Sequence, residues 1–412
     1  MSFFRFSLSH SLFILALTTG CSTVKHEMPA AVPVPVPVPV PAGKVPPPAA
    51  LAIAPPATVA TTAATLRPTT YAALPGWKQD DLREAWPAFR ASCDVLGRKA
   101  EWKEACTLAR DVAPTDARAV RQFFESVLVP HQVVNADGTD QGLVTGYYEP
   151  LLRGARKRSG VYQTPLYRVP DDLLNVDLAG VYPELKSLRL RGRMVGTKVV
   201  PYWTRAELMQ GDSLAGRELF WVDDAIDAFF LQVQGSGRVQ LADSRETVRV
   251  SYADQNGHPY RSIGRYLVDR GEMSLEQASA QSIKAWYAAH PARQQELLNA
   301  NPSYVFFREE KLSDPDQGPK GSLGVPLTPQ RSIAIDPQFL PLGAPVFLAT
   351  TQPNSETALQ RLVMAQDTGG AIRNAVRADF FWGFGALAGE QAGRMKQRGM
   401  MWVLLPRRAA SR

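Results

Sequence analysis

The residue pattern changes near Val133, and this change limits the folds that the chain can adopt. Beyond it, short runs of β-branched and aromatic residues alternate with turns of Gly, Asp and Pro, as in LVTGYYEPLL and VRVSYADQNGHPY. Runs of this length and composition are typical of strands. We expect further strands at FFLQVQGSGRVQLA, SYVFFRE, RSIAIDP, APVFLAT, LVMAQDTGG and MWVLLP. The body of the protein should therefore be a β-barrel or a β-sandwich.

Two parts of the chain have a helical pattern instead. The segments KQDDLREAWPAFRASCDVL and PTDARAVRQFFESVLVP repeat apolar residues every three or four positions, with Asp or Thr at their starts and Pro at their stops. A helical stretch, SLEQASAQSIKAWYAAHPARQQELLNA, also interrupts the predicted strands. The predicted fold class is mainly β with N-terminal helices, an α+β chain.

The N-terminus is predicted to be a processing signal. It has a single Arg5, an apolar run from Leu12 to Leu17, and small residues that end at Gly20 and Cys21. This run is too short to span a bilayer as a helix. The pattern is typical of a bacterial lipoprotein signal over residues 1–20, with acylation of Cys21. An ordinary secretory peptide is the alternative. Ser22, in place of Asp, favours the periplasmic face of the outer membrane, where buried acyl chains would hold the protein.

Residues 21–72 are rich in Pro, Val and Ala, including the run VPVPVPVPVP. Alternating Pro blocks helix and ladder hydrogen bonds and favours an extended, solvated chain. We interpret this segment as a semi-rigid tether between the anchor and the folded body. A disordered spacer without any selected reach is the alternative.

The remaining cysteines, Cys93 and Cys106, are predicted to form a disulfide between two neighbouring helices, because the signal implies an oxidising compartment. A metal site is disfavoured, since the five histidines are scattered without ligand spacing. We expect neither a metal nor a cofactor. The net charge of +7 is dispersed along the chain, without the dense basic stripe that nucleic acid requires.

Three carboxylates are the candidates for chemistry. Asp336 follows the predicted strand RSIAI, Asp367 follows LVMAQ, and Asp379 follows NAVRA. Asp before Pro or Gly is usually a turn residue, which is the interpretation favoured for Asp336. Asp379 differs because it precedes the apolar run FFWG, where desolvation would raise its pKa. A carboxyl that keeps its proton suits the cleavage of a glycosidic bond, while a buried structural acid is the alternative.

The segment SIAIDP…LPLGAPVFL…AQDTGGAIRNAVRADFFWG resembles the 3D domain, which is named for three aspartates in this arrangement. It follows VTGYYEPLL and DAFFLQVQGSGRVQL…YADQNGHPYRSIGRYLVDRG. This combination resembles the membrane-bound lytic murein transglycosylase A family of bacteria over roughly residues 75–405. This chain has one more residue between the Gly pair and Asp379 than the family spacing, which a surface loop would absorb.

The resemblance implies a double-psi β-barrel of residues 73–148 and 308–412, with a second β-domain of residues 149–307 inserted into it. The groove between them would hold a glycan strand. The implied reaction cleaves the β-1,4 bond between N-acetylmuramic acid and N-acetylglucosamine without water and leaves a 1,6-anhydromuramoyl end. One acid suffices, because the sugar's own 6-hydroxyl is the nucleophile.

The family match assigns the acid/base role to Asp379 and a supporting role to Asp367, while Asp336 would order the nearby loops. Alternation along a strand would place Gln232 and Gln234 on one face. Core packing is the alternative for the tyrosines, and a hairpin turn is the alternative for Ser236. The residues expected to bind substrate are Tyr147, Tyr148, Glu149, Gln232, Gln234, Ser236, Arg238, Asp336, Gly369 and Gly370.

Two rival functions remain open. A muramidase would hydrolyse the same bond with a second carboxylate, for which Glu149 or Asp367 could serve. A non-catalytic lipoprotein would grip peptidoglycan without shortening it. The expected partners are peptidoglycan glycan strands, outer-membrane lipid through acylated Cys21, and cell-wall synthases; nucleic acid is not expected.

Overall fold

The structure is a computed structural model that describes residues 59–61, 64–312 and 314–407. The chain divides into two units, Met1–Ala54 and Pro55–Arg412, and all the described residues belong to the second. The predicted signal peptide, Cys21 and most of the predicted tether lie outside the described residues. No helix within the described ranges is long and apolar enough to cross a membrane.

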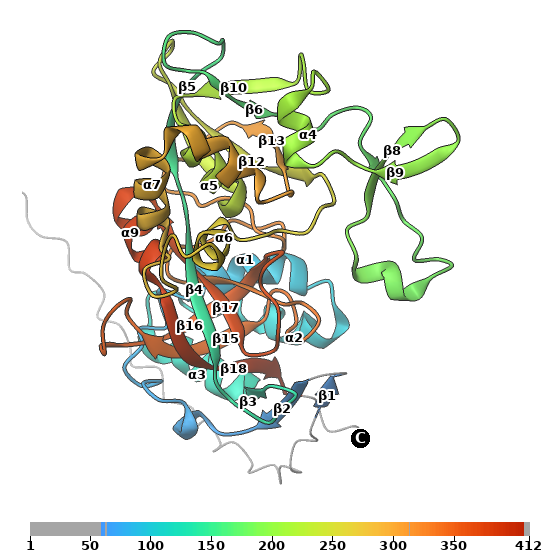
Figure 1. The fold of residues 1–412 in the computed structure, drawn as a ribbon. Coiled ribbons are helices and arrows are strands. Elements are labelled where there is room, and N and C mark those ends of the chain that lie inside the picture. The colour runs from blue at the N-terminus through green and yellow to red at the C-terminus, as the bar shows by residue number, and fades with distance from the viewer. Residues whose placement is uncertain (1–58, 62–63, 313, 408–412) are drawn as a thin grey trace, which may run out of the picture. The chain divides into compact units, whose positions relative to one another are not determined.

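Six strands close into a barrel (Figure 1). They follow one another in the order β18-β15-β16-β14-β17-β4, and pairing of β18 with β4 completes the circle. The pairs β14–β16 and β17–β4 are parallel, while the other pairs in the barrel are antiparallel. This closed barrel confirms the predicted fold class. The strands are β4 (Gly142–Glu149), β14 (Ser332–Ile335), β15 (Pro345–Thr351), β16 (Ala358–Thr368), β17 (Arg377–Phe384) and β18 (Lys396–Pro406).

Three further strands extend the barrel sheet beyond β18. β3 pairs with β18, β2 pairs with β3, and β1 pairs with β2, all antiparallel. The tether predicted over residues 21–72 therefore ends too late, because β2 is hydrogen-bonded into the sheet and Leu66 is buried in the core. The bounds are β1 (Val59–Thr61), β2 (Ala64–Pro68) and β3 (Leu128–Val134).

The predicted N-terminal helices are present and pack against the barrel. Asp116 accepts hydrogen bonds from the first turn of α3, as its position before an apolar repeat predicts. The Asp at the start of the first apolar repeat does not begin a helix. Helix α1 begins only at Trp86, and Asp80 pairs with Arg331 instead. The elements are η1 (Tyr71–Ala73), α1 (Trp86–Leu96), α2 (Ala100–Leu108), α3 (Ala117–Val127) and, after β17, α9 (Gly385–Arg394).

The predicted disulfide is present. Cys93 on α1 is bonded to Cys106 on α2, with their Cα atoms 5.3 Å apart. Leu96, Ala105 and Cys106 belong to the same core as the barrel interior. The disulfide therefore joins two helices that cover one side of this core.

The inserted domain has its own sheet, in the order β13-β12-β11-β5-β10-β6, and its own apolar core. The strands of this sheet run from Leu151, at the start of β5, to Glu310, at the end of β13, and β4 of the barrel ends just before them at Glu149. The strands are β5 (Leu151–Ala155), β6 (Thr164–Tyr167), β10 (Glu218–Val222), β11 (Ser236–Leu241), β12 (Thr247–Gln255) and β13 (Val305–Glu310).

Helices flank this sheet. The predicted helical interlude is confirmed by α7 and α8, which share a core with α5 and α6. The first half of FFLQVQGSGRVQLA is a helix rather than the predicted strand, because Asp224 caps the start of α5 and Gly235 ends it with φ at 81°. The elements are α4 (Arg205–Gln210), α5 (Ala225–Gln234), α6 (Ile263–Asp269), α7 (Ala280–Ala289), η3 (Pro291–Arg293) and α8 (Gln294–Asn299).

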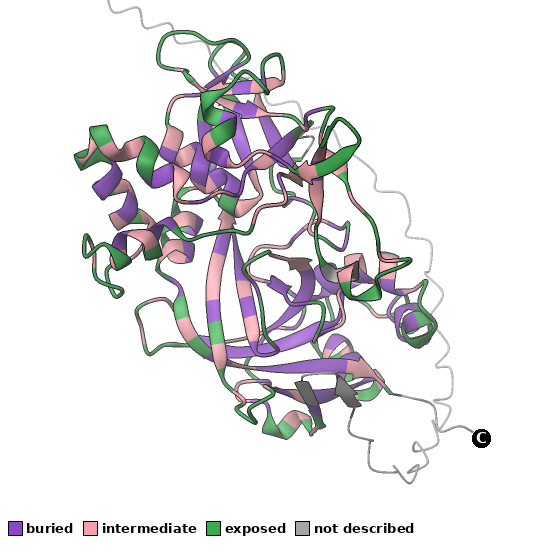
Figure 2. Cartoon of the chain, turned by 45° about the vertical axis from the view of Figure 1, so that its right-hand side comes forward, coloured by how far each residue is buried: buried purple, intermediate pink, exposed green. Residues whose placement is uncertain are grey.

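Between β6 and α4, residues 174–201 form an arm that projects from the inserted domain, at the right in Figure 1. It holds a three-stranded sheet in the order β7-β8-β9. Figure 2 shows that much of the barrel is buried, whereas exposed residues follow one another along this arm. Its elements are β7 (Leu174–Asn175), η2 (Pro183–Ser187), β8 (Arg191–Val195) and β9 (Lys198–Pro201).

Candidate active site

Two of the predicted aspartates lie in one row across the barrel. Ala334 on β14 is opposite Asp367 on β16 and also opposite Asp379 on β17. Asp379 is in turn opposite Thr145 on β4. Directly opposed residues share a face of the sheet, so all four side chains are on the same side. The barrel therefore brings Asp367 and Asp379 to one surface, with their Cα atoms about 10 Å apart from two strand spacings.

Asp379 is held by a short chain of hydrogen bonds. The Thr145 hydroxyl donates to Asp379 Oδ1 at 2.6 Å, and Arg377 Nη2 donates to the same hydroxyl oxygen at 2.9 Å. Asp379 is half-buried, so it lies below the surface without being sealed off. Burial raises the pKa of the Asp379 carboxyl above its ordinary value, while the Thr145 hydrogen bond and the Arg377 charge oppose that rise. The carboxyl thus keeps its proton to a higher pH than a free aspartate does.

Asp367 is surrounded by donors. Its Oδ1 accepts hydrogen bonds from the Ser322 amide, the Ser322 hydroxyl and the Thr368 amide, each at 2.9 Å. Its Oδ2 accepts one from the Tyr147 hydroxyl at 3.1 Å. Burial raises the pKa of Asp367, and these hydrogen bonds work against the rise. Four donors leave this carboxyl suited to accepting hydrogen bonds rather than to donating a proton.

Tyr147 and Tyr148 are separated by the alternation of β4. Tyr147 packs against Phe381 with ring centroids 5.2 Å apart and reaches Asp367. Its pKa is raised well above the ordinary value by burial and by the charges of Asp367 and Asp379, so it stays a neutral donor. Tyr148 packs at the edge of the barrel core, and its amide donates to Gln234 Oε1 at 3.0 Å. Only Tyr147 lies beside the aspartates.

Asp336 has the turn role that its position before Pro337 predicts. Its carboxylate accepts from the amides of Gln338 and Asn374, both at 3.2 Å, and pairs with Arg373 at 3.8 Å. It is only 2% exposed. Because these contacts connect the end of β14 to the loop before β17, Asp336 orders the loop that leads to Asp379. Its expected contact with substrate is disfavoured by this burial.

The glycine pair lies in that same loop. The amide of Ile372 donates to the carbonyl of Gly369 at 3.1 Å, which closes a turn directly after β16. A side chain at Gly369 would collide with Ile372, with a Cβ only 2.7 Å from its Cγ1. Gly370 is exposed and has open space around it. The predicted turn is therefore present, and Gly370 is exposed on it.

Glu149 was expected to bind substrate, and the structure corrects this. The side chain is fully buried, and its carboxylate pairs with Arg238 Nε at 2.8 Å and with Arg249 Nε at 2.6 Å. Arg238, also expected to bind substrate, is itself only 6% exposed and lies over the ring of Phe384. Glu149 ends β4 of the barrel, whereas the two arginines are on β11 and β12 of the inserted domain. This ion cluster therefore joins the two domains.

The structure corrects the strand predicted for Gln232 and Gln234, and it contradicts the alternative of a hairpin turn for Ser236. Gln232 and Gln234 are on helix α5, so strand alternation does not place them on a common face. Gln232 is buried and accepts from Arg205 at 2.7 Å, while Gln234 accepts from the amide of Tyr148. Ser236 begins β11 directly after the Gly235 cap, instead of forming a hairpin turn. The two amides hold the inserted domain together and connect it to β4.

Three residues near the aspartates were not anticipated, namely Thr145, Ser322 and Arg377. Thr145 is two positions before Tyr147 on β4, and Arg377 is two positions before Asp379 on β17, so both follow from alternation once the pairing is known. Ser322 comes from a loop without regular structure. Its contact with Asp367 spans 45 positions, and no local sequence signal indicates it.

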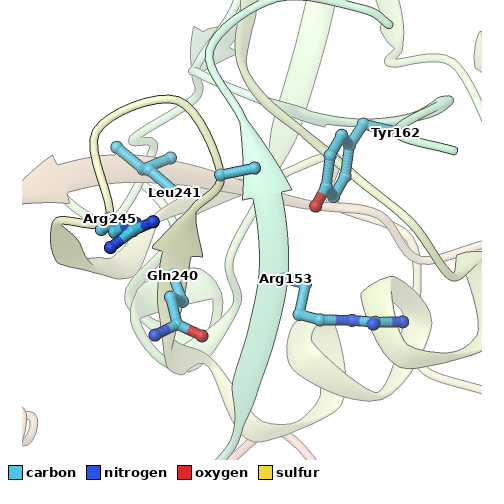
Figure 3. Close-up of a pocket in the computed structure, with 6 residues that line it drawn as sticks. Arg153, Tyr162, Gln240, Leu241 and Arg245 are labelled. Carbon is cyan, nitrogen blue, oxygen red and sulfur yellow. The ribbon is translucent and has the colours of Figure 1, made fainter. Parts of the chain in front are cut away.

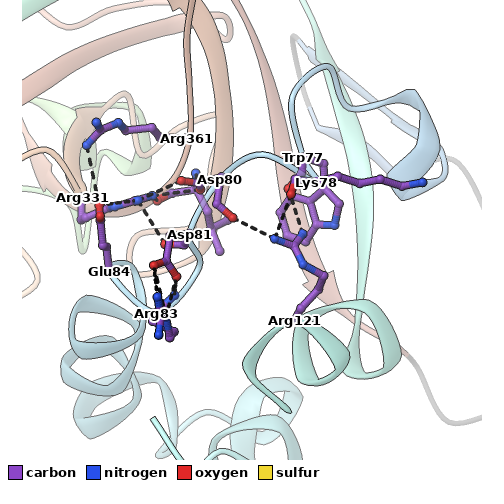
Figure 4. Close-up of polar contacts among 10 residues, drawn as sticks. Trp77, Lys78, Asp80, Asp81, Arg83, Glu84, Arg121, Arg331 and Arg361 are labelled. Atoms are coloured by element: carbon purple, nitrogen blue, oxygen red, sulfur yellow. Dashed lines mark hydrogen bonds and ion pairs between the residues drawn. The ribbon is translucent and has the colours of Figure 1, made fainter. Parts of the chain in front are cut away.

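Two concavities lie elsewhere. One has a volume of about 300 Å³ on the inserted domain, where Arg153, Tyr162 and Arg245 line it (Figure 3). The other, of about 350 Å³, lies where Arg331 holds Asp80 and Glu84 at 2.8 and 2.7 Å (Figure 4). Neither is lined by Asp367 or Asp379. In Figure 3 the two arginines point in different directions rather than toward one another.

We place the candidate active site on the face of the barrel rather than in either concavity. A half-buried acid with a raised pKa, a second carboxyl held by four donors and a neutral tyrosine all meet on one face of the barrel. Perturbed carboxyls that stay accessible are typical of catalytic centres. The fold and the site define a β-barrel enzyme that has two aspartate carboxyls on one face of its six-stranded barrel.

Comparisons with known proteins agree with this class. Residues 143–308 match the MltA specific insert domain, and residues 331–405 match the 3D domain. Membrane-bound lytic murein transglycosylase A of Escherichia coli K12 is 34% identical over 296 residues, which are 70% of this chain and 72% of the relative. This protein belongs to the membrane-bound lytic murein transglycosylase A family.

Solved structures of the family have the same fold. The crystal structure of MltA from Neisseria gonorrhoeae is 38% identical with a TM-score of 0.74, covering 86% of this chain and 96% of that one. The crystal structure of E. coli MltA with bound chitohexaose is 29% identical with a TM-score of 0.61, covering 83% and 94%.

Proposed function

We propose that this protein is a lytic transglycosylase of peptidoglycan. It cleaves the β-1,4 bond between N-acetylmuramic acid and N-acetylglucosamine and forms 1,6-anhydromuramoyl ends. Its family membership supports the reaction, and the relative with bound chitohexaose supports a β-1,4-linked amino-sugar chain as the ligand. The observation that carries the proposal is Asp379, a half-buried acid with a raised pKa on the accessible face of the barrel.

Asp379 acts first as acid and then as base. In its protonated form it donates to the leaving glycosidic oxygen, and as a carboxylate it then takes the proton of the sugar's 6-hydroxyl. That hydroxyl attacks the anomeric carbon, and the two proton transfers return Asp379 to its starting form. No water enters the reaction, so no second carboxylate is needed to activate one.

The hydrogen bonds around Thr145 determine which oxygen of Asp379 carries the proton. Arg377 can only donate, so its bond to Thr145 Oγ1 occupies an acceptor position of that hydroxyl. The hydroxyl hydrogen is then directed at Asp379 Oδ1, at 2.6 Å. Since Oδ1 is an acceptor, the acidic proton belongs on Oδ2, and Oδ2 should face the scissile bond.

Asp367 supports the reaction without exchanging a proton. Its carboxylate, held by Ser322, Thr368 and Tyr147, supplies negative charge beside the positive charge that develops at the anomeric centre. This assignment weakens the muramidase alternative. Hydrolysis needs a carboxylate free to bind a water, but Glu149 is fully buried and Asp367 already accepts four hydrogen bonds.

Product analysis tests the proposal. Purified sacculi are digested with the protein, and the released muropeptides are analysed by mass spectrometry. Anhydromuramoyl ends are expected. Reducing ends would establish a muramidase, and binding without any shortening of the strands would establish the non-catalytic lipoprotein.

We further propose that Cys21 is acylated and holds the protein at the periplasmic face of the outer membrane. The support is the short apolar run that ends at Gly20, Cys21 and Ser22. The test is membrane fractionation of cells that express Cys21→Ala. If this variant stays with the outer membrane as the wild type does, the lipid anchor is excluded. Cell-wall synthases remain predicted partners.

A further inference from the structure

The arm of residues 174–201 carries an unusual concentration of exposed apolar side chains. Seventeen large apolar side chains are exposed in the part of the chain with described burial, and seven of them belong to this arm. Val181 is the most exposed of the seven, at 75%. The seven are Leu178, Val181, Tyr182, Leu188, Met194, Val195 and Val199. Groups of exposed apolar side chains mark surfaces that contact a protein or a membrane.

The base of the arm is fixed to the inserted domain. Arg191 pairs with Asp254 on β12 at 2.9 Å, and the guanidinium of Arg193 lies 3.4 Å from the ring centre of Trp203. From this base, β8 and β9 run outward as an antiparallel hairpin. The hairpin is therefore presented in a defined direction, and its outer end is the exposed part (Figures 1 and 2).

The outer end of the hairpin is apolar on both of its faces. Met194 is opposite Val199, and the two share one face of the ribbon. Val195 is opposite Lys198, and this pair lies on the other face. All four residues are exposed. A lipid interface contacts both faces of such a ribbon, so it would cover Met194, Val195 and Val199 together.

A cation accompanies these apolar residues. Lys198 lies at the outer end beside Val195, whereas the guanidinium of Arg189 lies over the ring of Tyr252 on β12, at the base of the arm. A lysine can extend its apolar stem along buried lipid while its ammonium group stays among the headgroups. Apolar side chains that enter the interface, next to cations that meet lipid phosphates, are the combination that binds anionic membranes.

We infer that the arm is a membrane-contact element, whose hairpin end inserts into the headgroup region of an anionic phospholipid leaflet. This contact is separate from the acyl anchor proposed at Cys21 and does not depend on the catalytic proposal. An acyl chain on a long tether fixes only the distance from the membrane. A second contact through the arm would also fix which side of the inserted domain faces the lipid.

The test uses the mature chain from residue 21 onward with Cys21→Ser, so that no acyl group contributes. Its binding is measured by co-sedimentation with vesicles of phosphatidylglycerol and phosphatidylethanolamine, and with vesicles of phosphatidylcholine alone. The wild-type arm should prefer the anionic vesicles. Met194→Ser with Val195→Ser should weaken binding to both kinds by about tenfold or more, because the inserted apolar area is lost.

Lys198→Glu should weaken binding to the anionic vesicles by at least about fivefold, and added salt should reduce that difference. The matched control is Leu387→Ser on α9, which removes an apolar side chain that is 80% exposed outside the arm. This control should bind as the wild type does. Thermal midpoints should be unchanged in all variants, since each substituted residue is exposed.

Two results would overturn the inference. The first is the absence of vesicle binding by the wild-type arm. The second is equal vesicle binding by the hairpin variant and the wild type. If that variant also cleaves soluble glycan strands more slowly, the arm is assigned to substrate instead.

Discussion

Thr145 donates a hydrogen bond of 2.6 Å to Asp379, although 234 positions separate the two residues in the chain. They meet because β4 and β17 are parallel neighbours in the closed barrel and lie in register at this point. Arg377 holds the Thr145 hydroxyl from the other side. The hydrogen bond that sets the proton position on the proposed acid therefore comes from β4, a strand that is distant in the sequence but adjacent in the barrel.

Asp379→Asn should abolish most of the activity. Asparagine keeps the shape and still accepts from Thr145, but it cannot donate and then regain a proton. Losing a proton-transfer catalyst costs about 10²–10⁴-fold in rate, and glycan binding should persist. The measurement is the release of anhydromuropeptides beside glycan co-sedimentation. Asp367→Asn should be impaired less, and Asp336→Asn mainly in thermal midpoint. A dead, well-folded Asp367→Asn with an active Asp379→Asn would reverse the two roles.

Thr145→Val should change the pH profile in a specific direction. Activity falls as pH rises through the pKa of Asp379, because the protonated acid is consumed. The Thr145 hydrogen bond lowers that pKa, so its removal should shift the alkaline limb to higher pH and reduce kcat. Thr145→Ser keeps the hydroxyl and is the control. Titration of the Asp379 carboxyl carbon by NMR checks the shift independently of activity; an unchanged pKa would contradict the assignment.

The raised pKa of Asp379 also predicts a stability effect. The folded state holds this proton more tightly than the unfolded state, whose carboxyl has the ordinary value of 3.8. The contribution of this proton to the free energy of unfolding is thus complete below pH 3.8, and it is lost as the pH rises through the pKa of the folded state. Asp379→Asn avoids this loss and should melt at a higher temperature than the wild type at neutral pH. The gain should shrink toward pH 4, and a lower midpoint at neutral pH would refute the prediction.

Removing the Cys93–Cys106 disulfide should destabilise the helical cover of the barrel. The cysteines are 13 positions apart, and closing a loop of about this size contributes roughly 3 kcal/mol in the chain-entropy model. Urea unfolding of Cys93→Ser with Cys106→Ser measures the change. The wild type under reducing conditions should show the same loss. Equal unfolding midpoints for the oxidised and the reduced protein would show that the disulfide does not contribute to stability.

Glu149→Gln should be strongly destabilising. It would leave Arg238 and Arg249 buried without a counter-charge, and breaking a buried pair typically costs about 3–5 kcal/mol. The exposed pair of Arg156 and Glu309, at 2.8 Å, supplies the control. Glu309→Gln should cost less than about 1 kcal/mol. Similar losses in the two variants, measured by urea unfolding, would show that burial does not set the strength of the Glu149 cluster.

The sequence by itself determined the features that depend on near neighbours. Strands β13, β14, β15, β16 and β18 follow from their short apolar runs, α3 begins after Asp116, and Cys93 and Cys106 are bonded as expected. The error at α5 was also local. Its apolar run fits a helix or a strand, and the arbitrating signals, Asp224 before it and Gly235 after it, were outweighed by β-type composition.

The tertiary structure decided which polar groups meet. Asp367 and Asp379 could be identified from their motif, but Thr145, Arg377 and Ser322 join them only through the pairing of distant strands and the path of one loop. Glu149 was predicted to bind sugar beside Tyr147 and Tyr148, but in the structure it is a buried carboxylate that pairs with arginines of the inserted domain. Helix caps and strand alternation act over a few residues, so the sequence displays them directly. Burial and long-range pairing depend on how the whole barrel closes, and no short stretch of sequence contains that information.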